Sequence, residues 1–220
     1  MVCPDLRRNA AAGWRITAPV QGLQIGVVTD LEDPAGEERI RVRLPMVNAA
    51  DDGAWMRMVS LDAGNNRGWV IRPELGDEVI VGFLNNDPRH GVVLGMVHSS
   101  KHAAPIPASN DNHQKGFVSR SELKVLFDDE KKIITISTPG GHQFVMSDDE
   151  TSITLQDSNG NKLVMDSNGI TVESIKDLKM KAAMNANLEG GVQTKVSGGA
   201  GAELSSGANT AVKGAIVQLN

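Results

Sequence analysis

An eight-residue repeat in the C-terminal part of the chain constrains its fold more than any other feature of the sequence. A large apolar residue recurs at every eighth position, in the column Val164, Val172, Met180, Leu188, Val196, Leu204 and Val212. From position 172 on, a small residue stands two positions later, in the column Ser174, Ala182, Gly190, Gly198, Ser206 and Gly214. Repetition at a fixed period is typical of stacked repeats, in which each unit buries its apolar side against the next.

The period is too short for a solenoid made by one chain. Eight extended residues span about 26 Å at roughly 3.3 Å per residue, so a closed coil has too few residues for both its walls and its corners. We therefore expect each octad to supply one strand and one corner, and several chains to share each turn. The small residues then mark tight corners, where glycine tolerates a positive φ.

Two other structures fit the repeat less well. A disordered tail rich in Gly, Ala and Ser has no reason to keep large apolar residues in phase. A helix would lose about 1 kcal/mol for each glycine relative to alanine. The geometry of the octad leaves the number of chains per turn open, at more than one.

Composition excludes several classes of protein. The net charge of −5 excludes a strongly basic nucleic-acid binder. Aromatic residues make up 3% of the chain and none follows Phe144, so the C-terminal part lacks the large side chains of an ordinary globular core. Cys3 is the single cysteine, which excludes a disulfide framework. No apolar run is long enough to cross a membrane as a helix, and the N-terminus has no hydrophobic signal segment.

Strand-like alternation begins after a lead-in segment at residues 1–20. Strands are predicted at residues 23–31, 39–46, 55–61, 78–84 and 91–98. In the second of these, Ile40, Val42 and Leu44 alternate with three arginines. A polar loop is expected at 62–68, and a hairpin around residues 85–88. Five short strands without a helical period predict a Greek-key barrel or OB-fold domain over residues 21–98.

A linker rich in Ala, Pro, Ser and Asn is expected at residues 99–116, before strands resume. The next strands are predicted at residues 123–127, 133–137, 143–146, 153–156 and 162–165. Explicit turn sequences such as Asp157-Ser158-Asn159-Gly160 separate them. We interpret residues 117–165 as the broader base of a β-prism, which narrows to an octad-repeat β-helix over residues 166–220.

Several runs of residues resemble the VgrG-type spike proteins of contractile injection systems, which include type VI secretion systems, phage-tail-like particles and myophage baseplates. The similarity to their OB-fold is carried by residues 22–28, 39–45, 73–88 and 93–95. Residues 127–130, followed by residues 138–141, are similar to the family's shaft entrance. The octads that start at Val196 and Val212 match the family's V-x-G repeat fully, and the octad at Leu188 nearly so.

The resemblance implies an OB-fold barrel followed by an intertwined homotrimeric triangular β-helix that serves as a membrane-piercing spike. It implies as partners a PAAR-repeat cap at the tip, hub, tube and baseplate proteins on the N-terminal side, and, transiently, the target cell envelope. The family's upstream hub-like domains are missing, so we expect Met1 to begin a fragment of a longer spike protein. We expect synthesis in the cytoplasm, assembly into an injection particle, and delivery outside the cell or into a target cell.

The resemblance also implies a cap-binding tip, which the apolar residues at the end of the chain support. The tip comprises Gly214, Ala215, Ile216, Val217, Gln218, Leu219 and Asn220.

No catalytic constellation is evident, so we expect no enzymatic activity, no cofactor and no metal. His98 and His102 have metal-like spacing but span a strand end and the linker, which favours a solvated pair. Some spike tips of the family bind iron through closely spaced histidines, but no histidine follows His142. Asp157 begins a run that resembles a calcium loop, yet Lys162 stands where such a loop needs glycine, so a polar turn is favoured.

Two other functions stay open. A tail lysin or polysaccharide depolymerase can also be a trimeric β-helix, although this shaft has neither aromatic sugar platforms nor a column of paired carboxylates. The basic row Arg39, Arg41 and Arg43 on an OB-fold is compatible with single-stranded nucleic acid. The negative net charge and the few aromatics disfavour that function, and we expect no nucleic-acid partner.

Overall fold

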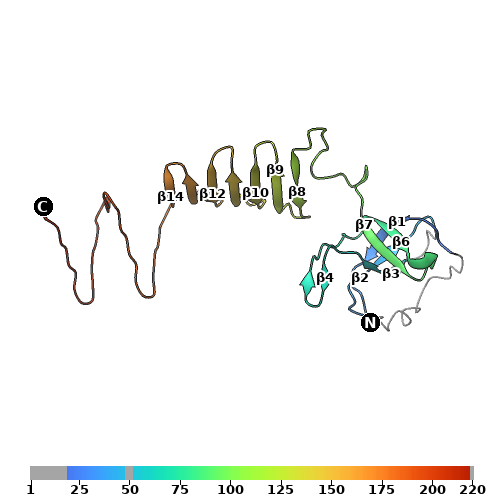
Figure 1. Ribbon diagram of the computed structural model, residues 1–220. Coiled ribbons are helices and arrows are strands. Elements are labelled where there is room, and N and C mark those ends of the chain that lie inside the picture. Colours follow the sequence, from blue (N-terminus) through green and yellow to red (C-terminus); the bar gives the residue numbers. More distant parts are fainter. Residues whose placement is uncertain (1–18, 48–51, 219–220) are drawn as a thin grey trace.

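A barrel, a row of antiparallel strands and an extended C-terminal segment follow one another along the chain (Figure 1). The structure is a computed structural model that describes residues 19–47 and 52–218. Within these ranges every helix or strand is β except one 3₁₀ turn. The all-β class predicted from the sequence is therefore confirmed, whereas the lead-in at residues 1–20 lies almost entirely outside the described residues.

The barrel confirms the predicted OB-like architecture. Its five strands close in the order β1-β2-β3-β7-β6, and the β3–β7 pair is parallel while the other pairs are antiparallel. The strands are β1 (Gln24–Asp30), β2 (Arg39–Arg43), β3 (Ala54–Met58), β6 (Glu78–Phe83) and β7 (Gly91–Met96). Full closure leaves no free strand edge in this part of the chain, which protects it from pairing with other sheets.

Alternating apolar residues of these strands fill the barrel. Ile40, Val42 and Leu44 point inward as their alternation predicts, and each is buried. The remaining buried apolar side chains are Val28, Met56, Val79, Val81 and Val93. Gly26 lets two strands approach closely, because a Cβ there would lie 2.3 Å from Val42 Cγ1. Burial of these aliphatic side chains, at about 1.5–3 kcal/mol each, is the main stabilising term of the barrel.

One connection of the barrel agrees with the prediction made from the sequence, and another differs from it. The β6–β7 hairpin turns through the 3₁₀ helix η1 (Leu84–Asn86), where Asn85 and Asn86 have positive φ, a conformation that asparagine tolerates. The predicted polar loop at 62–68 instead contains a small hairpin, β4 (Ala63–Gly64) with β5 (Arg67–Gly68). Two-residue strands have no alternation from which the sequence could predict them.

A seven-stranded meander follows the barrel, and each strand pairs with its neighbours in sequence. Its strands are β8 (Gln114–Val118), β9 (Lys124–Asp128), β10 (Ile133–Ser137), β11 (Gln143–Ser147), β12 (Ser152–Gln156), β13 (Lys162–Asp166) and β14 (Gly169–Glu173). The middle five match the predicted strands closely. β8 begins inside the segment expected to be a linker, and β14 coincides with the start of the octads.

Beyond β14 the described chain to residue 218 forms no strand, but it bends with the period of the sequence. Paired bends fall at residues 175–176, 183–184, 191–192, 199–200, 207–208 and 215–216. Each pair directly follows a residue of the small column. In Figure 1 the segment runs away from the sheet as extended stretches that reverse direction. An extended, regularly bent chain that pairs with no other strand of the described chain has the geometry of a strand whose partners are other chains.

Candidate trimerisation interface

The register of the meander gathers its apolar side chains on one face, here called the apolar face. Directly paired residues lie side by side on the same face of a sheet, and successive residues of a strand alternate between faces. One row across the sheet is Phe117, Val125, Ile136, Phe144, Leu155, Leu163 and Val172. The second row on that face is Phe127, Ile134, Met146, Ile153, Met165 and Ile170.

The opposite face of the sheet is mixed and largely polar. Its central row alternates Leu126, Thr135, Val145, Thr154, Val164 and Thr171. Its outer rows carry mostly Lys, Gln, Ser, Asp and Glu side chains, with Val118 and Ile133 among them. A sheet with one apolar and one polar face packs the apolar face against another layer.

No layer of the described chain covers the apolar face. Leu155 is 55% exposed and Ile170 71% exposed. The large apolar side chains of the octads are even more exposed to solvent: Met180 is 90% exposed, and Leu188, Val196 and Leu204 are each more than three-quarters exposed. Contiguous apolar surface of this extent marks a site of association, since soluble monomers rarely leave so much of it in water.

The structure corrects the beginning of the octad column. Val164 pairs with Thr171 on the mixed face, whereas Val172 pairs with Leu163 on the apolar face. The β13–β14 hairpin therefore places the first two members of the column on opposite sides of the sheet. A hairpin reverses the chain, so a constant spacing in sequence does not keep two residues on one face across it.

The structure gives a different reason for the small column than the one expected. Gly190, Gly198 and Gly214 do not have the positive φ expected for tight corners. The constraint is close approach: a Cβ on Gly198 would lie 1.9 Å from the carbonyl oxygen of Gly201, and one on Gly190 would lie 2.5 Å from that of Gln193. Serine and alanine occupy the same column elsewhere, so the column requires small side chains.

The turn at Asp157 anchors the first octad to the sheet. Asp157 accepts hydrogen bonds from the backbone N–H groups of Asn159 and Asn161, at 2.9 Å each, and from both side-chain amides. The Asn161 amide, which donates at 2.7 Å, contributes most to lowering the pKa of Asp157 to about 2. Asn161 Oδ1 in turn accepts the backbone N–H of Ile175 at 2.9 Å. The run that resembles a calcium loop is thus a hydrogen-bonded turn.

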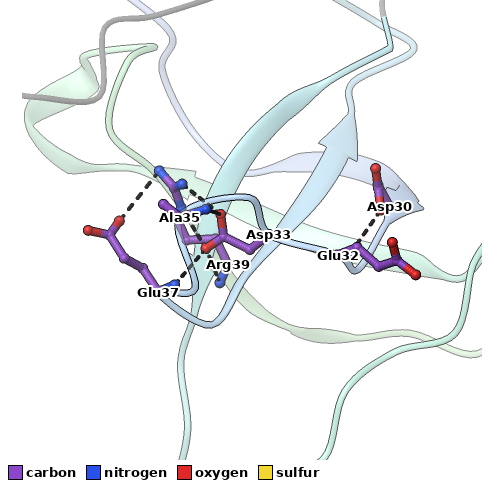
Figure 2. A network of polar contacts seen from close by, with 6 residues as sticks. All are labelled: Asp30, Glu32, Asp33, Ala35, Glu37 and Arg39. Atoms are coloured by element: carbon purple, nitrogen blue, oxygen red, sulfur yellow. Dashed lines mark hydrogen bonds and ion pairs between the residues drawn. The ribbon is translucent and has the colours of Figure 1, made fainter.

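An ion pair explains one of the three arginines in the row on β2, and it is drawn in Figure 2. Arg39 Nη2 and Nε donate to the two carboxylate oxygens of Asp33 at 2.7 and 3.0 Å, and Glu37 lies 3.6 Å from the same guanidinium. The backbone N–H groups of Ala35 and Glu37 donate to Asp33 as well. The Arg39 hydrogen bond holds the pKa of Asp33 well below its ordinary value.

This pairing removes Arg39 from the expected basic row. Its side chain is 9% exposed and that of Asp33 is 5% exposed. Arg41 donates to the carbonyl oxygen of Gly53 at 3.2 Å and lies 3.8 Å from Asp52. Two of the three arginines of the row are therefore engaged within the barrel, and the row is not a free cationic strip for phosphate groups.

One of the two histidines with metal-like spacing, His102, contacts the barrel. His102 Nδ1 lies 3.4 Å from a carboxylate oxygen of Asp77 on the barrel, and the backbone N–H of His102 donates to Ser99. Among the described residues, no three His, Cys, Asp or Glu side chains are arranged to hold a metal ion. The same part of the chain contains no helix with the length and apolarity needed to cross a membrane.

The expected tip is only partly described. Ile216 and Val217 are exposed at the end of the octad segment. Leu219 and Asn220 lie outside the described residues.

Two family models match the two folded parts of the chain. Residues 24–98 match the type VI secretion system/phage-baseplate injector OB domain. Residues 133–220 match the phage baseplate V C-terminal trimerisation domain. The second match covers most of the apolar face and the whole octad segment, the surfaces that the single chain leaves bare. It supports a homotrimer and a baseplate-like assembly.

Curated spike proteins from two bacteria are among the relatives similar to this chain. The type VI secretion system spike protein VgrG4b of Pseudomonas aeruginosa is 33% identical over 135 residues, which is 56% of this chain and 14% of that protein. The spike protein VgrG1c of the same organism is 32% identical over 113 residues, 46% of this chain and 15% of that protein. The spike protein VgrG3 of Vibrio cholerae is 28% identical over 107 residues, 44% of this chain and 10% of that protein.

The chain thus spans a small part of the length of the relatives it matches. The chain is thus built of a type VI secretion system/phage-baseplate injector OB domain followed by a phage baseplate V C-terminal trimerisation domain, and VgrG spike proteins of type VI secretion are its homologues.

Proposed function

We propose that three copies of this chain form the central spike of a contractile injection system, which punctures a target envelope and carries a cap and effectors at its tip. The observation that carries this proposal is the uncovered apolar face together with the exposed octads. Three such faces turned toward a common axis cover one another in a triangular prism. Closed threefold symmetry lets every copy make identical contacts.

The mechanical role follows from how such a shaft holds together. Octad strands that hydrogen-bond to neighbouring chains leave few free edges except at the tip. Unfolding requires the strands of all three chains to separate together, which gives a high kinetic barrier. A shaft of this kind withstands the axial force of a contracting sheath. The relatives described above are named as spike proteins, which supports a structural rather than an enzymatic role.

We place the partners at the two ends. A PAAR-repeat cap binds the tip at residues 214–220, and hub, tube and baseplate proteins join on the N-terminal side. The spike is made in the cytoplasm, is assembled into the particle, and leaves it when the particle fires. The target envelope is a transient partner.

Solution mass tests the assembly directly. Light scattering on a sizing column should give three times the chain mass of 23.4 kDa, which is about 70 kDa. The assembly should also run intact in SDS before boiling and as single chains after it. A clean single-chain mass over the working concentration range would refute the proposal.

A pull-down tests the tip. Deleting residues 214–220 should abolish capture of a PAAR-repeat protein while leaving the trimer mass unchanged. Capture that persists after the deletion would place the cap elsewhere. The alternative of a tail lysin is tested separately. We expect the purified trimer to show no peptidoglycan hydrolysis above buffer.

A further inference from the structure

An apolar arm projects from the barrel at residues 59–72, between β3 and β6. In Figure 1 its hairpin, β4 with β5, stands away from the barrel in the direction of the meander. Its large apolar side chains are in solvent in the single chain: Val59, Leu61, Trp69, Val70 and Ile71. Leu61 is 93% exposed and Trp69 62% exposed. An apolar group of this size at one place marks a binding surface.

The arm is held in a defined shape by its own backbone. The single proton of the Ser60 hydroxyl lies between the carbonyl oxygens of Asp62 and Trp69, which are 3.0 and 2.8 Å from Oγ, and the Trp69 N–H donates to the Asp62 oxygen at 3.0 Å. Gly68 has φ +140°, and a Cβ there would lie 2.4 Å from the same oxygen. A short two-stranded hairpin is marginal in water by itself, whereas a prearranged one binds a partner at little entropic cost.

The charges of the arm are already paired within the chain. Arg67 Nη1 lies 2.5 and 2.7 Å from the two carboxylate oxygens of Asp62. Arg72 pairs with Glu38 beside the arm. The arm therefore offers apolar contact and little free charge, which suits a protein surface better than nucleic acid or anionic lipid.

An ion pair also connects the base of the arm to the meander. Glu74, just after the arm, lies 2.7 Å from Arg120 in the turn between β8 and β9. Leu75, next to Glu74 in the sequence, and Phe117, at the start of the first apolar row, are exposed apolar residues. Exposed apolar side chains therefore occur on the arm, beside it and on β8, all before the matched trimerisation region begins at residue 133.

We propose that the arm docks onto a neighbouring copy of this chain, so that the barrels as well as the shafts contact one another around the axis. This inference rests on the proposed trimer. Each copy gives one arm and receives one, a head-to-tail contact that a threefold ring closes without leaving an arm unsatisfied. The arm lies in the injector OB domain, outside the residues matched by the trimerisation domain.

Photo-cross-linking tests the contact in the full chain. A photoreactive amino acid replaces Leu61, and a control chain carries it at Met46, a residue of similar exposure in the turn after β2. After irradiation of the purified trimer and boiling in SDS, the chain modified at 61 should give a band at twice 23.4 kDa. The control should give none.

The possible failures are distinguishable. If the protein is trimeric but the chain modified at position 61 gives no band at twice the chain mass, the arm contact is wrong and the proposed spike is unaffected. A single-chain mass for the unmodified protein overturns the trimer itself. A second measurement compares the unmodified trimer with the single chains that Leu155→Asp should leave: amide hydrogens of residues 59–72 should exchange more slowly in the trimer. Equal exchange of these amides in trimer and single chain contradicts the contact even if the photoreactive chain folds poorly.

Discussion

Replacing Asp33 with asparagine should destabilise the barrel more than any other conservative change in its loops. Asp33 accepts two hydrogen bonds from the guanidinium of Arg39 and others from the backbone of the β1–β2 loop. Removing one partner of a buried ion pair costs about 3–5 kcal/mol. The lower end applies here, because Glu37 remains 3.6 Å from Arg39 and compensates part of its charge. We expect a loss of about 3 kcal/mol.

Urea unfolding followed by tryptophan fluorescence measures this loss, since Trp55 lies on β3. For a domain of this size an m-value of about 1 kcal/mol/M converts the loss into a midpoint lower by about 3 M. The matched control is Asp30→Asn, since Asp30 accepts one backbone N–H, that of Glu32, in the same loop. The control should cost no more than about 1 kcal/mol.

A stricter test is how the difference in unfolding free energy between the native protein and Asp33→Asn depends on pH. The pKa of Asp33 is lowered in the folded chain, chiefly by the Arg39 hydrogen bond. Its contribution is therefore complete above the pKa of the unfolded chain, near 3.9, and is lost as pH falls below that value. The difference in unfolding free energy between the native protein and Asp33→Asn should have its largest value at pH 7 and should decrease below about pH 4. Equal midpoints for Asp33→Asn and Asp30→Asn, or a gap that grows in acid, would refute the reasoning.

Three further predictions concern the shaft. Leu155→Asp places a charge on the apolar face in three copies and should leave single chains by light scattering, whereas Gln156→Asp, on the opposite face, should stay trimeric. Gly198→Ala should lower the temperature at which SDS dissociates the trimer, by a cost of about 1–3 kcal/mol per chain, whereas Gly199→Ala, with open space around its Cβ, should not. Because the pKa of Asp157 is about 2, its hydrogen bonds should persist at pH 7 and down to about pH 4, and should be lost toward pH 2, which carboxyl NMR titration measures. A midpoint near 4 would contradict the anchored turn.

The barrel and the meander could be predicted from sequence because their strands alternate cleanly. Ile40, Val42 and Leu44 show the inward face of β2 without any structural information. Arg39 could not be placed in the same way, because its burial depends on a carboxylate six residues earlier, and alternation says nothing about such a partner. The start of β8 lay in the expected linker because Gln114 and Lys115 are polar and only their pairing with β9 makes them part of a strand.

The trimerisation interface, too, could be predicted from the sequence only in part. The octad period indicated shared turns, and the exposed octads agree with it. The two rows of the apolar face depend on which residues stand opposite one another, which turn lengths set and a residue column cannot reveal. Val164 shows this, since it keeps the octad spacing yet lies on the other face from Val172.

The meander, in which every strand pairs only with its neighbours in sequence, also sets an order of events during biogenesis. Contacts between neighbouring segments close short loops and form quickly, so each chain can complete this sheet while still alone. The described octads beyond residue 176 form no strand pair with their own chain, so we expect them to order only after three sheets have met. Encounter of the sheets is then the one concentration-dependent step, and the shaft zips from base to tip within a complex already formed. Chains shortened by one or two octads should accordingly associate at the same rate as the full chain.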